Sequence, residues 1–166
     1  MKLVLFVAAG LFASAHAYAQ SAEETAVFLT FGLKEGGIYG DSDQQGTVRK
    51  LSSDPLKLHL DTGKSMTMTM TVTQPEPCQF RIQVSDIDRD PKIRTDTTFD
   101  FNNFVGVDNM MDMFTQPVFS GECPVTNSSK GCIKPFVGAR QLFVPIANSK
   151  AAADYMKSTF CSGRAF

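Results

Sequence analysis

The alternation of apolar and polar residues between Met66 and Val84 is the feature that most constrains the fold of this chain. On both sides of a proline-containing segment, even-numbered positions carry Met, Val, Cys, Phe or Ile, whereas odd-numbered positions carry Thr, Gln or Arg. A repeat of two residues is typical of a strand with one buried and one exposed face. The stretch therefore predicts a β-hairpin whose even-numbered side chains enter the core.

The two prolines in this stretch set the expected register of the hairpin. Proline has no N–H for the hydrogen-bond ladder, so the loop is expected to run from Thr73 to Pro77. Met70 would then lie opposite Phe80 and Met68 opposite Ile82.

Weaker patterns predict the remaining elements. A strand is expected at 55–60, where leucines alternate with Lys57 and His59, and further extended segments are expected at 47–51, 93–105 and 140–146. Residues 24–33 are interpreted as a strand covered on both faces, and residues 107–119 as either strand or a short helical turn. One helix is expected at 148–161, capped by Asn148 or Ser149 and followed by Gly163. The fold class is thus mainly β, an antiparallel sandwich or partly closed barrel with one C-terminal α-helix.

The first nineteen residues have the form of a secretory signal peptide. Lys2 precedes an apolar run from Leu3 to Ala15, and the small residues before Gln20 form an A-x-A site. Cleavage after Ala19 would leave residues 20–166 as one domain, and a competing site follows Ala17. We therefore expect an exported protein, periplasmic or extracellular.

Export makes disulfides the expected state of the four cysteines. Three pairings are possible, and the turn-forming residues between Cys123 and Cys132 favour that pair, which leaves Cys78 to join Cys161. Two disulfides, Cys123–Cys132 and Cys78–Cys161, are accordingly predicted.

Charge and hydropathy limit the partners. The formal net charge is −1 and the basic residues are dispersed, so neither nucleic acid nor an anionic membrane is an expected partner. No segment after the leader has the ~20 apolar residues that a membrane span requires. We expect a monomer without a cofactor.

The candidate binding surface is the polar face of the hairpin. Its residues share the odd-numbered, outward-facing positions: Thr67, Thr69, Thr71, Gln79, Arg81 and Gln83. A rigid, disulfide-linked β scaffold with such a face suits a noncatalytic binding or inhibitor-like module for a protein or glycan partner. This inference rests on architecture, because the sequence has no motif for nucleophilic catalysis. No G-x-S-x-G motif is present, and His59 is the one histidine after the leader.

Two metal sites are weaker alternatives. Met66, Met68 and Met70 provide thioethers of the kind that bind Cu(I), which would make this a periplasmic copper-handling protein, but alternation places them in the core. Asp41 and Asp43 resemble the start of a calcium loop that lacks its final glutamate. A carboxylate-dependent hydrolase is the remaining alternative, since acids are plentiful.

Overall fold

The computed structural model describes residues 20–39, 45–61, 67–86, 90–110, 114–120, 127–128, 131–132 and 146–162. Several predictions concern residues outside these ranges. They are the signal peptide at 1–19, the calcium ligands Asp41 and Asp43, Met66, Cys123 of the predicted bridge to Cys132, and residues 140–145 of the strand expected at 140–146.

A six-stranded antiparallel meander forms the larger sheet, with the strands in chain order. Its strands are β1 (Ile38–Tyr39), β2 (Gly46–Ser53), β3 (Leu56–Asp61), β4 (Thr67–Glu76), β5 (Gln79–Asp86) and β6 (Asp90–Asp100). The predicted antiparallel β architecture is therefore confirmed. β1 and β6 are the two edges of the sheet, so the described strands do not close into a barrel.

A short 3-10 helix, η1 (Phe101–Asn103), leads from β6 into the second sheet. This sheet has the order β7-β8-β10-β9 and consists of β7 (Phe104–Met110), β8 (Phe114–Phe119), β9 (Asn127–Ser128) and β10 (Gly131–Cys132). The segment 107–119, which allowed two interpretations, is thus strand wherever the structure describes it.

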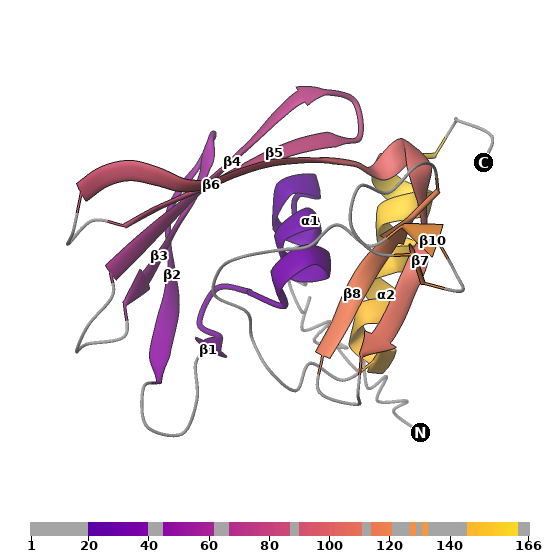
Figure 1. The fold of residues 1–166 in the computed structure, drawn as a ribbon, viewed down its shortest axis with the longest axis horizontal. Coiled ribbons are helices and arrows are strands. Elements are labelled where there is room, and N and C mark those ends of the chain that lie inside the picture. The colour runs from indigo at the N-terminus through magenta and orange to yellow at the C-terminus, as the bar shows by residue number, and fades with distance from the viewer. Residues whose placement is uncertain are drawn as a thin grey trace, which may run out of the picture.

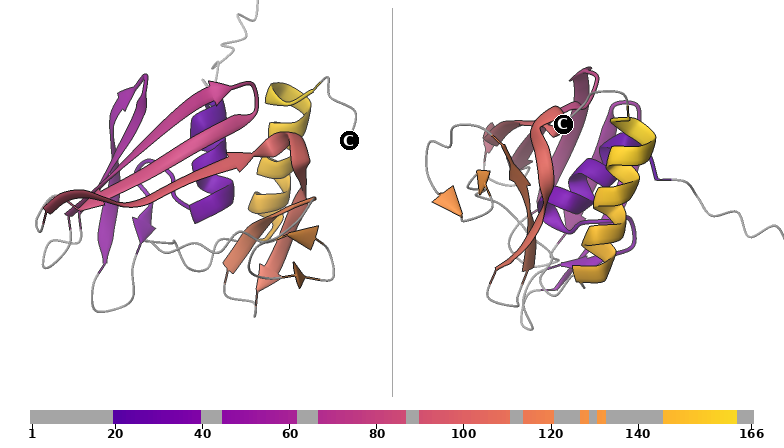
Figure 2. Two further views of the ribbon diagram at one scale, coloured as in Figure 1. Left: turned by 45° about the horizontal axis from the view of Figure 1, so that its top comes forward. Right: turned by 90° about the vertical axis from the view of Figure 1, so that its right-hand side faces the viewer.

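Two helices complete the fold. Helix α1 (Ala22–Phe31) lies beneath the curved large sheet, and α2 (Ile146–Tyr155) packs beside α1 and along the β7–β8 hairpin (Figure 1). Figure 2 shows both helices on the same side of the large sheet, which leaves its convex face without a described helix. In a β-sandwich a second sheet would pack against the concave face of the large sheet, but here helix α1 packs against that face.

The prediction of a strand at 24–33 is wrong, because these residues form α1 and the loop after it. Ser21 and Glu24 form a reciprocal capping box, with the Ser21 N–H donating to Glu24 Oε2 at 3.0 Å and the Glu24 N–H to Ser21 Oγ at 3.1 Å. Gly32 ends the helix in the left-handed conformation, with φ 71°. The alternation of Val27, Leu29 and Phe31 suggested a strand, but α1 is enclosed by the rest of the fold. Its buried residues are therefore not confined to one helical stripe, and the period of a helix is hidden.

The hairpin of β4 and β5 is present, but the predicted register is wrong by four residues. Met70 pairs with Val84 and Val72 with Ile82, instead of Met70 with Phe80. The shift arises because the chain turns tightly at Pro77 and Cys78, and the pairing has an irregularity between Thr73 and Glu76. Pro75 lies within that irregularity, where a missing N–H breaks no ladder bond. Because even positions still face even positions, the predicted buried face is unchanged.

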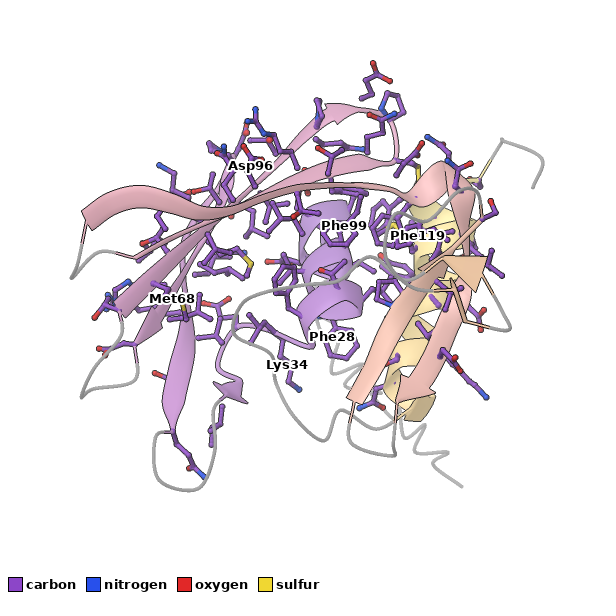
Figure 3. All side chains as sticks on the ribbon, viewed as in Figure 1. Phe28, Lys34, Met68, Asp96, Phe99 and Phe119 are labelled. Carbon is purple, nitrogen blue, oxygen red and sulfur yellow. A yellow bond between two sulfur atoms is a disulfide. The ribbon has the colours of Figure 1, made fainter. Side chains whose placement is uncertain are left out.

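Phenylalanines join the two sheets into one core. The Phe101 ring contacts those of Phe80, Phe104 and Phe119, with centroid distances of 5.5, 5.1 and 5.4 Å. Phe99 links this cluster to α1 through Phe31. Figure 3 shows Phe99 and Phe119 inside the fold and Met68 on the inner side of the large sheet.

The C-terminal helix is confirmed, with different ends. It begins at Ile146, so Asn148 and Ser149 lie within it and do not cap it, and a π-helical turn, η2 (Met156–Phe160), follows. Immediately afterwards Cys161 forms the predicted disulfide with Cys78 at the turn between β4 and β5. Both cysteines are buried, so the bridge fixes the end of the helix against the large sheet.

Candidate functional site

The convex face of the large sheet collects the predicted binding residues on neighbouring strands. Cross-strand pairing places Lys57, Thr71, Gln83 and Asp96 in one row from β3 to β6. An adjacent row contains Thr73, Arg81 and Thr98, and another contains His59, Thr69 and Ser85. We refer to the residues of these three rows as the convex polar face. Thr67 and Gln79 extend it at the two ends of the hairpin.

Asp96 is the residue of this face that sequence reasoning missed. The Arg81 Nε donates to Asp96 Oδ1 at 2.8 Å, and a second guanidinium nitrogen donates to Oδ2. The Gln83 side-chain amide donates to the same Oδ2 at 3.0 Å. Two predicted residues are therefore held in place by an unpredicted third, since a bidentate pair constrains both side chains.

These hydrogen bonds stabilise the charged form of Asp96. The guanidinium of Arg81, followed by the amide of Gln83, lowers the pKa of Asp96 to about 2. The same contact raises the pKa of Arg81. The pair lies on the surface, with half of the Arg81 side chain exposed, so it orders the face more than it stabilises the fold.

The face differs in charge from one side to the other. The charges of Arg81 and Asp96 neutralise each other. The other basic side chains lie on β2 and β3, where Lys57 is opposite Thr71 and Arg49 is opposite His59. His59 faces outward, as predicted, but it is half-buried. Arg49 and Lys57 therefore place basic groups on the β2–β3 side, where the exposed Asp61 also lies opposite Thr67. The threonine hydroxyls of β4 separate these charges from the Arg81 network.

Two cavities lie at the surface of α1, on the other side of the large sheet. One of about 260 Å³ is bounded by the helix, the loop that follows it and strands β2 and β3, and its charged lining residues are Glu24, Lys34, Glu35 and Lys50. The other, of about 350 Å³, opens between α1 and α2 and is lined by Phe28, Tyr155 and neighbouring small residues. Gln20 and Lys34 line both cavities. Phe28 and Lys34 lie at the same end of α1 (Figure 3).

The first cavity contains an ion pair that anchors α1 to the sheet. Lys50 Nζ donates to Glu24 Oε1 at 2.8 Å, and both side chains are largely covered, with 29% and 23% exposed. Burial by itself would raise the pKa of Glu24, but the hydrogen bonds from Lys50 and the Ser21 N–H outweigh it and lower that pKa. The bond to Glu24 in turn raises the pKa of Lys50.

This electrostatics disfavours acid catalysis in the cavity. A glycosidase requires one carboxylic acid with a raised pKa as its proton donor. Glu24 is held in the opposite state, and its oxygens are already bonded to Lys50 and to the Ser21 N–H. The carboxylate-dependent hydrolase therefore gains no support from this cavity.

The methionines predicted as alternative copper ligands are core residues where the structure describes them. Met68 is 5% exposed and Met70 1%, and their strand face is shared with Val72, Phe80 and Ile82. Within the described ranges, no group of three His, Cys, Asp or Glu side chains is arranged to hold a metal ion. The burial of these thioethers matches their role as core filler.

Comparisons with known proteins identify no relative of this chain: no family model, curated protein or solved structure matches it. Among the helices that the structure describes, none is long and apolar enough to cross a membrane.

Proposed function

We propose that this protein is an exported, noncatalytic binding module whose binding surface is the convex polar face. The observation that carries the proposal is the difference in burial between the two faces of the large sheet. The concave face carries the core and is covered by α1, whereas the convex face presents an ordered set of polar groups that no described helix covers.

The chemistry of the convex polar face supports binding at low entropic cost. Threonine is restricted at χ1, and Thr69 and Thr71 are held in the middle of the sheet between β3 and β5. Arg81 and Gln83 are fixed by Asp96, so fewer rotamers remain to be lost when a partner docks. A protein or glycan partner would thus meet donors and acceptors that are already in position.

The disulfide supports the same proposal because it stiffens the frame behind this surface. It joins the turn between β4 and β5 to the end of the C-terminal helix, and β4 and β5 carry most of the convex polar face. A binding surface on paired strands is held more accurately than one on loops.

The test reverses the surface chemistry without touching the core. A Thr69→Glu/Arg81→Glu variant should lose the partner that the wild-type protein retains from a native extract of its source cell. The loss should exceed tenfold, because a new charge at the centre of an interface leaves partner groups unpaired.

A Lys150→Glu variant is the matched control, because Lys150 is exposed on α2, away from the convex face. It should bind as the wild type does, and circular dichroism should show all three proteins folded. Equal retention of the partner by the double variant and the wild type would refute the convex polar face as the binding surface.

A further inference from the structure

Gln20 occupies an unusual place in this structure. It directly precedes Ser21, the N-cap of α1, and it lines both the cavity beside β2 and the cavity between α1 and α2. It is also the residue that becomes the N-terminus if the leader is cleaved after Ala19. An N-terminal glutamine has its α-amine within reach of its own side-chain amide.

We propose that Gln20 is converted to an N-terminal pyroglutamate, and that the resulting ring lies at the junction of the two cavities. The proposal uses the predicted cleavage site and does not depend on the binding function above.

The chemistry requires no cofactor or oxidant. The neutral α-amine nitrogen attacks the side-chain amide carbon, Cδ, and the new N–Cδ bond closes a five-membered lactam. The Cδ–Nε2 bond breaks, and the leaving nitrogen takes the proton given up by the amine and departs as ammonia. A charged, nucleophilic terminus is replaced by a neutral ring with one N–H donor and one carbonyl acceptor.

The charges around Gln20 favour the neutral product. The charged side chains lining the first cavity are two ammonium groups, Lys34 and Lys50, and two carboxylates, Glu24 and Glu35, so they balance. Glu24 is engaged by Lys50 and by the Ser21 N–H. A free α-ammonium at Gln20 would add a positive charge to that balanced set and would face the positive end of the α1 dipole, and Glu23 in the first turn of the helix would offset only part of it. Cyclisation removes this charge.

The backbone of the helix start does not need the α-amine. The capping box is complete between Ser21 and Glu24, and the Thr25 N–H donates to the Ser21 carbonyl at 2.9 Å. The amine of Gln20 is therefore available to react without disturbing α1. Phe28 and Tyr155 line the second cavity together with Gln20, and aromatic rings suit contact with a compact lactam.

Intact mass spectrometry of the protein exported from the full-length chain tests the modification. The expected mass is that of residues 20–166, less one ammonia and the hydrogens lost to disulfides, with the loss located on the N-terminal peptide. A free amine on Gln20, or an N-terminus at any other residue, would overturn the proposal.

A Gln20→Asn variant is the matched control. Its side chain also ends in an amide but is one methylene shorter, so the equivalent attack would form a strained four-membered ring. The variant should keep its free α-amine, and any ammonia that it loses should come from attack of the Ser21 backbone nitrogen on Cγ, which leaves that amine intact. Blocking of the α-amine to an equal extent in this variant would place the reaction elsewhere and contradict the assignment.

Pyroglutamyl peptidase tests the location of the ring. The folded protein should resist removal of its first residue, whereas the same protein unfolded in urea should lose it at least tenfold faster. Equal rates in the two states would show that the ring does not lie in the cavities.

Discussion

The disulfide between Cys78 and Cys161 should supply a large share of the folding stability. The two cysteines are 83 residues apart, so the bridge closes a long loop in the unfolded chain. In the chain-entropy treatment a loop of this length corresponds to about 4.5 kcal/mol at 25 °C. Because domains of this size are usually stable by only about 5–15 kcal/mol, the loss should be easy to detect.

A Cys78→Ala/Cys161→Ala variant removes the bridge without leaving a lone thiol to mispair. Alanine is the appropriate replacement because both positions are buried, at 3% and 5% exposed. With a urea dependence of about 2 kcal/mol per molar, the unfolding midpoint should fall by about 2 M.

Equilibrium urea unfolding followed by circular dichroism measures this shift. A Cys78→Ala variant alone should fall at least as far, because Cys161 then has no partner. If the urea midpoint of the double variant falls by less than a quarter of the expected shift, packing alone holds α2 against the sheet. That result would refute the entropic reasoning.

Three further predictions concern the helix cap, the aromatic core and the convex polar face. Ser21→Ala should lower the stability by about 1 kcal/mol in thermal unfolding, because it removes the N-cap of α1; no change would deny the capping box. Phe101→Ala should cost about 3–5 kcal/mol in urea unfolding, because it empties the centre of the phenylalanine cluster; a loss below 1 kcal/mol would contradict that packing. The Asp96 carboxyl should titrate near pH 2 by NMR, and in an Arg81→Gln variant its pKa should rise toward the ordinary value of about 4. Because folding lowers this pKa, the stability it contributes is complete above about pH 4 and is lost as the pH falls through about 2, so an unchanged Asp96 titration in the variant would refute the pairing.

Strands β3, β4 and β5 of the large sheet were predictable because each has one face in the core and one in solvent. In β3, Leu56, Leu58 and Leu60 are all buried, while Lys57 is exposed, so the burial follows the sequence with a period of two. Alternation of this kind depends only on the residues of the strand itself. It does not specify the pairing partner, so the hairpin face was correct and its register was not.

Helix α1 could not be recognised from periodicity, because an enclosed helix has no polar stripe. Even Thr25 and Thr30 are buried, with the Thr30 hydroxyl donating to the Ala26 carbonyl at 2.7 Å. The useful signals were at its ends, where Ser21 is followed three residues later by Glu24 and the helix stops at Gly32.

The candidate site was predictable in part. Arg81 and Gln83 belong to the alternating pattern of β5, whereas Asp96 lies on β6 and meets them only through the pairing of the two strands. That pairing contains two irregularities, so the partner of Arg81 could not be counted from the sequence. The cavities beside α1 depended on recognising the helix and were missed with it.

Site-specific photo-crosslinking most directly tests the claim that the convex polar face binds a partner. A photoreactive side chain at Thr71, at the centre of the face, is compared with the same group at Lys150 on α2. One partner species should crosslink from Thr71 and not from Lys150, and Arg81→Glu should abolish the crosslink. Crosslinking of the partner from Lys150 alone would contradict binding at the convex polar face.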